Sequence, residues 1–167
     1  NLDDAFSDPD IDAVVLVTPH TQHADQVVAG AATGKHILTE KPFALKKADG
    51  LRAAKAMTDA GLTLGIGHNY RYGAAVWEMK KIIDSGKLGE IHHIEGNLSH
   101  QGQLGVEGWR RATEEAPTGG VVHFGAHIID IMCWYGGPMR EVYAQLESRI
   151  IENDVGSVLV KFESGTT

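Results

Sequence analysis

The chain has 167 residues, 43% of them hydrophobic, which is enough for one ordinary globular domain or two short ones. Its formal net charge is -7 and the acidic residues are dispersed, so no basic stripe exists to bind nucleic acid or an anionic membrane surface. No apolar run approaches the roughly 20 residues that span a bilayer. The single cysteine, Cys133, permits no internal disulfide, which favours a cytoplasmic protein.

The first part of the chain, up to Gly67, alternates between short apolar runs and helical patterns. Residues 12–18 form an apolar run rich in β-branched side chains, as is typical of a strand buried on both faces of a parallel sheet. The predicted elements are a strand over 12–18, a helix over 21–33, a strand over 36–39, a helix over 46–60 and a strand over 62–66. This order predicts the C-terminal part of a Rossmann-type, doubly wound parallel sheet, with ligands at the carboxyl ends of the strands.

The pattern changes after Gly67, where a second domain is expected to begin. The predicted elements are a helix over 74–85, a strand over 90–99, an irregular Gly-rich segment over 102–118, a helix over 121–135, and strands over 141–150 and 156–162. We therefore predict two domains, residues 1–67 and residues 68–167, within an α/β fold class.

The Glu40-Lys41-Pro42 turn directly follows a predicted buried strand. Pro42 fixes φ and removes a backbone donor, so the turn is stiff and its charged side chains are placed. A lysine held at the carboxyl end of a strand can donate to a substrate hydroxyl. The alternative is a solvated Glu-Lys pair on an ordinary surface turn.

Short motifs run in order along almost the whole chain. They are Asp12 to Pro19, His23, Ala32 to His36, Glu40-Lys41-Pro42, Gly67 to Arg71, Ser85 to Gly89, Trp109-Arg110, and Gly119-Gly120 to Asp130. In this order and spacing the set resembles the glucose-fructose oxidoreductase, inositol dehydrogenase and rhizopine-catabolism (Gfo/Idh/MocA) family. Each motif is weak alone, whereas the ordered set is specific.

The resemblance implies an enzyme that transfers a hydride between NAD or NADP and a sugar, polyol or related hydroxylated ring. It implies that residues 1–67 end a dinucleotide-binding Rossmann domain. Residues 68–167 would begin a substrate and oligomerisation domain of α+β type, with an open, mostly antiparallel sheet. A homo-oligomer, either a dimer or a tetramer, would form through that sheet.

The resemblance also implies roles for individual residues. Lys41 corresponds to the family's active-site lysine, which hydrogen-bonds the substrate oxygen, while Glu40 and Pro42 shape the loop on the cofactor side. The resemblance places Thr18, Pro19 and His23 in the loop and helix start that lie beside the ribose and diphosphate of the cofactor. The alternatives are a strand-end turn for Thr18-Pro19 and a polar residue at a helix N-terminus for His23.

Three further positions match the family less specifically. Arg71 corresponds to a segment that borders the substrate pocket, and Trp109 with Arg110 corresponds to a pair near the nicotinamide end of the cofactor. The alternatives are a surface ion pair for each arginine and core packing for Trp109.

Two histidines of the predicted helix over 121–135 bear on the chemistry. His127 resembles the family's catalytic histidine, which takes the hydroxyl proton as hydride leaves for the nicotinamide; an imidazole, with an unperturbed pKa of ~6.5, suits that role. The alternative is a core histidine on an apolar helix. His123 stands one turn earlier, where most relatives have an aspartate, and supplies no negative charge. We expect an altered substrate preference or a less basic His127, and the division of the acid-base role stays open.

Two other function classes remain as alternatives. His123, His127 and Asp130 lie at helical spacings compatible with a divalent metal ion, although no glutamate lies between the histidines as in the zincin motif. A family member without catalysis could instead sense a dinucleotide or a sugar. No Gly-x-Gly-x-x-Gly turn occurs in the sequence, so we expect a fragment that lacks the residue choosing between NAD and NADP.

Overall fold

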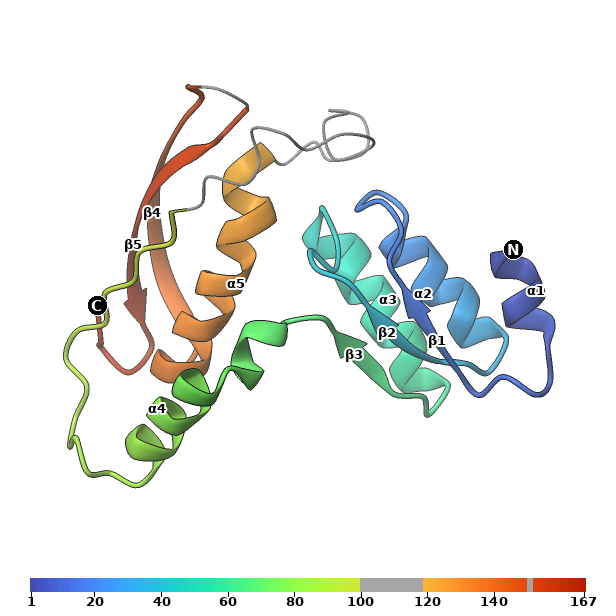
Figure 1. Ribbon diagram of the computed structural model, residues 1–167, viewed down its shortest axis with the longest axis horizontal. Coiled ribbons are helices and arrows are strands. Elements are labelled where there is room, and N and C mark those ends of the chain that lie inside the picture. The colour runs from blue at the N-terminus through green and yellow to red at the C-terminus, as the bar shows by residue number, and fades with distance from the viewer. Residues whose placement is uncertain (100–118, 150–151) are drawn as a thin grey trace. The chain divides into compact units, whose positions relative to one another are not determined.

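A computed structural model of the chain describes residues 1–99, 119–149 and 152–167 (Figure 1). The described residues group into two compact units that meet in sequence between Gly67 and His68. The first unit contains residues 1–67, and the second contains the described residues that follow. No helix in the described part of the chain is long and apolar enough to cross a membrane.

The first unit is built on a parallel sheet in the order β1-β2-β3. Its strands are β1 (Ala13–Leu16), β2 (His36–Thr39) and β3 (Leu64–Ile66), connected by α2 (His23–Ala32) and α3 (Lys47–Asp59). Val14 pairs with Ile37, and Leu38 pairs with Gly65. Right-handed crossovers between strands in sequential order put both helices on one face, where α2 and α3 contact each other (Figure 1). The predicted βαβαβ order is confirmed.

The core of this unit lies between the sheet and the helices. Leu16, Ile37, Val27 and Met57 are buried there, as is Phe6 of a short N-terminal helix, α1 (Leu2–Ser7). A Cβ on the α2 residue Gly30 would lie 2.6 Å from Cδ1 of Ile37, so glycine permits the close approach of helix and strand.

The opposite face of the sheet differs from the expectation for residues 12–18. Val15 is 63% exposed and Val17 is 67% exposed, whereas Leu16 between them is 2% exposed. The strand therefore buries one face among the described residues, because both connecting helices lie on the same side of the sheet.

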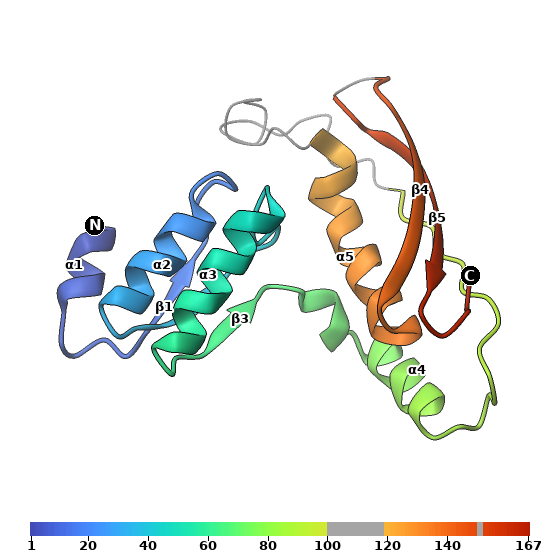
Figure 2. The same cartoon turned by 180° about the vertical axis from the view of Figure 1, so that it is seen from behind.

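The second unit combines helices with an antiparallel hairpin, as Figure 2 shows from behind. Its elements are a 3₁₀ turn η1 (Asn69–Tyr72), α4 (Ala74–Asp84), α5 (Gly119–Gly136), β4 (Met139–Glu147) and β5 (Val155–Phe162). A Cβ on Gly156 would lie 3.0 Å from both Leu146 and Val121, so this face of the hairpin packs on α5. The hydroxyl of Tyr135 in α5 donates to the carbonyl of Val76 in α4 at 2.8 Å. The predicted combination of helix and antiparallel sheet is confirmed.

The predicted strand over 90–99 is wrong, because this segment forms no strand. Its backbone meets the end of the chain, where the amide of Ile94 donates to the Thr167 carbonyl at 2.8 Å and the Thr167 amide donates to the His92 carbonyl at 3.2 Å. Alternating apolar and polar residues favour an extended backbone, but a strand also requires a ladder of backbone hydrogen bonds to a neighbouring strand. The two hydrogen bonds to Thr167 do not form such a ladder.

Candidate functional site

Two loops lie at the carboxyl edge of the parallel sheet in the first unit. Thr18 and Pro19 follow β1, and the Glu40-Lys41-Pro42 turn follows β2. The ladder continues to the start of the turn, because the Glu40 amide donates to the Leu16 carbonyl at 2.9 Å. Adjacent parallel strands thus bring the predicted cofactor loop and the predicted lysine turn to the same edge.

His23, the first residue of α2, joins these two loops. Its side chain is fully buried, with Nδ1 at 2.8 Å from the carbonyl oxygen of Pro42 and Nε2 at 2.9 Å from that of Thr18. The Thr18 hydroxyl also donates to Oε1 of Gln26 in α2 at 2.5 Å. The start of α2 therefore fixes both loops by side-chain hydrogen bonds.

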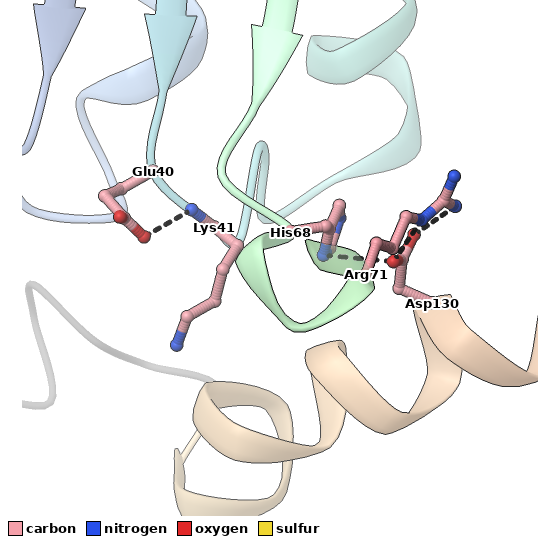
Figure 3. Close-up of polar contacts among 5 residues, drawn as sticks. All are labelled: Glu40, Lys41, His68, Arg71 and Asp130. Carbon is pink, nitrogen blue, oxygen red and sulfur yellow. Dashed lines mark hydrogen bonds and ion pairs between the residues drawn. The ribbon is translucent and has the colours of Figure 1, made fainter. Parts of the chain in front are cut away.

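The Lys41 turn is braced by its own neighbours. The Lys41 amide donates to Oε2 of Glu40 at 3.2 Å, as Figure 3 shows, and the Lys41–Pro42 peptide bond is cis. A Cβ on Gly67 would lie 3.2 Å from Oε1 of Glu40, so the glycine after β3 makes room for this carboxylate. Lys41 is half-buried and Pro42 is buried.

His127 in α5 is the most buried of the candidate residues in the second unit. It is 6% exposed, and the ring of Tyr70 from η1 stacks on it with centroids 4.1 Å apart and planes 7° apart. The ring of His68 meets the His127 ring edge-on, with centroids 6.3 Å apart. The η1 turn therefore fixes the plane of the predicted catalytic imidazole.

Arg71 and Asp130 form a bidentate ion pair between η1 and α5. Nε and Nη2 of Arg71 each donate to one oxygen of Asp130 at 2.6 Å, and Nδ1 of His68 lies 3.9 Å from the same carboxylate (Figure 3). The hydrogen bond to Asp130 raises the pKa of Arg71 above its usual range. The guanidinium also lies 5.2 Å from the ring centre of Trp134. Arg71 therefore ties η1 to α5 as well as standing at the predicted substrate-side position.

His123 lies one turn before His127 in α5 and is half-buried. Its ring packs edge-on against Phe124, with centroids 5.0 Å apart. No group of three or more His, Cys, Asp or Glu side chains is placed to hold a metal ion within residues 1–99, 119–149 and 152–167. The three residues of the metal hypothesis therefore do not converge, and Arg71 occupies both oxygens of Asp130.

Cys133 lies one turn beyond Asp130 in α5 and is half-buried. Burial raises the pKa of its thiol, and the nearby Asp130 carboxylate raises it further. A thiol kept protonated is a poor nucleophile. The remaining candidates, Trp109 and Arg110, lie outside the described residues.

Sequence reasoning missed two side chains that the structure brings to His127. Tyr70 and His68 belong to the Gly67 to Arg71 motif, but only its arginine was selected there. The signal was present as two aromatic side chains beside a candidate arginine at the end of a strand.

Two family models match the chain. The model described as the oxidoreductase family with an NAD-binding Rossmann fold matches residues 1–68. The model described as the GFO/IDH/MocA C-terminal domain matches residues 76–167, which is more than half of the chain.

Individual relatives match over parts of their length. The 1,5-anhydro-D-fructose reductase of Ensifer adhaerens is 32% identical over 134 residues, covering 79% of this chain and 40% of the relative. The scyllo-inositol 2-dehydrogenase (NAD(+)) of Bacillus subtilis (strain 168) is 32% identical over 99 residues, covering 59% of this chain and 29% of the relative. A solved structure of levoglucosan dehydrogenase in complex with NADH and levoglucosan has a TM-score of 0.85 at 27% identity, covering 99% of this chain and 48% of the other. The chain spans about 40% of the length of the first curated relatives that it matches.

Proposed function

Since the chain belongs to the GFO/IDH/MocA oxidoreductase family, as its ordered motifs predict, we propose that it carries part of an NAD(P)-dependent dehydrogenase or reductase. The substrate is a sugar, a polyol or a related hydroxylated ring, and the reaction takes place at a CH–OH group. The observation that carries the proposal is the braced Lys41 turn at the carboxyl edge of a parallel sheet, next to the loop that follows β1.

The residues at this edge fit a dinucleotide. Thr18, Pro19 and Lys41 are half-exposed, so the loops are accessible, and the hydroxyl and ammonium donors suit ribose and phosphate oxygens. We assign NAD or NADP binding to Thr18, Pro19, Glu40, Lys41 and Pro42, with Trp109 and Arg110 at the nicotinamide end. When bound, the nicotinamide accepts a hydride from the substrate carbon or returns one to it.

Lys41 acts on the reacting oxygen of the substrate in this proposal. Its ammonium donates a hydrogen bond to that oxygen and stabilises the negative charge that develops as the hydroxyl proton leaves. Because Pro42 is held by His23 and Glu40 accepts from the Lys41 amide, the turn restricts the positions open to the lysine. A placed donor needs less reorganisation than a mobile one.

His127 is the proposed acid-base residue. In the oxidative direction the imidazole accepts the hydroxyl proton, and in the reductive direction it returns the proton to the oxygen. Tyr70 holds the plane of the ring, and His123, one turn earlier on α5, is the proposed second substrate-binding imidazole. Arg71 contributes to the substrate side through its ion pair with Asp130, which holds η1 on α5.

The hairpin of the second unit supports a homo-oligomer in this proposal. Tyr143 and Leu159 pair across the strands and are 67% and 72% exposed. Side chains alternate along a strand, so this pair faces away from α5, and an exposed apolar face suits burial against a second copy. Light scattering of the protein and of its Leu159→Glu variant tests this, since a charge in the contact would favour the monomer.

The replacement Lys41→Met in the full-length protein tests the function most simply. The wild type is first screened across sugars and polyols with both NAD and NADP. We expect Lys41→Met to lower kcat about 10²-fold to 10⁴-fold, because the charged donor to the reacting oxygen is lost. Lys47→Met is the matched control, since Lys47 is an exposed lysine at the start of α3, and its turnover should match the wild type. Unchanged turnover in Lys41→Met would contradict the proposed role, and dinucleotide binding without turnover of any substrate would favour a sensing protein.

A further inference from the structure

The fully buried imidazole of His23 has no chemical task in the proposed reaction. Both of its ring nitrogens lie within hydrogen-bond distance of the chain's own carbonyl oxygens, at 2.8 Å from Pro42 and 2.9 Å from Thr18. These contacts leave neither nitrogen directed at a bound dinucleotide. The expected contact between His23 and the cofactor stays a prediction, and the geometry indicates a different task.

The two partners of His23 belong to the two loops at the carboxyl edge of the sheet. Pro42 lies in the Lys41 turn, and Thr18 lies in the loop that follows β1. One fully buried ring therefore contacts both loops at once.

We propose that His23 is a positioning residue whose buried ring clamps the Pro42 carbonyl to the Thr18 carbonyl and so holds the Lys41 turn beside the end of β1. The atom that it binds on the turn belongs to the residue directly after Lys41. The clamp itself rests on geometry within the first unit. Its effect on catalysis rests on the proposed function of Lys41.

Nitrogen NMR of the full-length protein with ¹⁵N-labelled histidine tests the clamp directly. The His23 ring signals are assigned as those lost in His23→Gln. We expect the His23 ring N–H to exchange slowly with water, because the ring is fully buried between two carbonyl oxygens. Exchange as fast as at the exposed His92 would overturn the proposal without bearing on Lys41 or the dehydrogenase function.

Kinetics of variants test whether His23 acts through Lys41. A Gln side chain carries its N–H donors on one nitrogen in place of two separated ring nitrogens, so His23→Gln should lower kcat about tenfold to a hundredfold by loosening the turn. His92→Gln, at an exposed histidine of the second unit, is the control and should leave kcat unchanged. In the Lys41→Met background, His23→Gln should cause no further loss. A loss of the same size in that background would overturn the positioning role, whereas an unchanged Lys41→Met enzyme would contradict the proposed function instead. If His23→Gln does not fold, the NMR measurement decides, with assignment by sequential correlations.

Discussion

His23 in the first unit and His127 in the second are both buried, and different contacts hold their rings. Both ring nitrogens of His23 lie within hydrogen-bond distance of carbonyl oxygens, so the ring is held through its nitrogen atoms. His127 is held through its face by the Tyr70 ring, and a stacking contact does not use the nitrogen atoms of an imidazole. Two buried histidines of this chain are therefore held by different parts of the imidazole ring.

Removing the His127 imidazole should give the largest effect among the variants of the second unit. His127→Asn takes away the proposed proton acceptor, and we expect kcat to fall about 10²-fold to 10⁴-fold. The matched variant His123→Asn should raise KM more than it lowers kcat if His123 binds substrate. Steady-state kinetics of both variants measure these changes. A larger kcat loss in His123→Asn than in His127→Asn would assign the acid-base role to His123 and substrate binding to His127.

The ion pair that holds η1 on α5 should give the next largest effect, on stability. Arg71→Lys keeps the charge but cannot donate two parallel hydrogen bonds to Asp130, so we expect the free energy of unfolding to fall by about 1–2 kcal/mol. Thermal or denaturant unfolding measures the change. Arg52→Lys is the control, because its pair with Asp25 is exposed and little change is expected. Equal effects in both variants would mean that the bidentate geometry does not matter.

The Tyr70 stack should contribute a smaller effect on the rate. Aromatic pairs contribute about 0.5–1.5 kcal/mol, so Tyr70→Ala should lower kcat by roughly 2-fold to 13-fold through a less well-oriented His127. Tyr70→Phe keeps the stacked ring and should retain the wild-type rate. A loss in Tyr70→Phe that matches Tyr70→Ala would instead assign the effect to the hydroxyl group.

The smallest expected effect is on the alkylation rate of the Cys133 thiol, which tests how well this part of α5 is buried. Its pKa is raised by burial, so the reactive thiolate is scarce at neutral pH and becomes populated only above the range of an ordinary thiol. Alkylation followed by mass spectrometry across pH should therefore be slow at neutral pH and accelerate in the alkaline range. Rapid alkylation at neutral pH would contradict the packing of α5 against η1.

The sheet of the first unit could be predicted because its signals are local. Short β-branched runs and helices that end near Gly34 and Gly61 determine the order of strands and helices. α1 was not predicted, although Asn1 and Asp4 form a capping box at its start, because six residues carry too little periodicity. The 3₁₀ turn η1 (Asn69–Tyr72) was also not predicted, because it is shorter still.

The sequence predicted the residue types of the candidate site more fully than the contacts between those residues. Ordered motifs selected Lys41, His23 and His127, but the two carbonyl partners of His23 come from loops separated by α2 and β2. The stack of Tyr70 on His127 joins segments that lie still further apart in sequence. Contacts of this kind depend on the packing of whole elements, which a pattern along the chain does not encode.

Transfer of an isotopic label tests the central proposal of direct hydride transfer most directly. The full-length protein is given an active sugar or polyol that carries deuterium on the reacting carbon, together with NAD or NADP, and the nicotinamide is analysed by mass spectrometry. The account predicts one deuterium on the reduced nicotinamide for each substrate oxidised, with the rate strongly lowered in Lys41→Met and in His127→Asn. Deuterium released to water instead, or transfer at the wild-type rate in both variants, would contradict it.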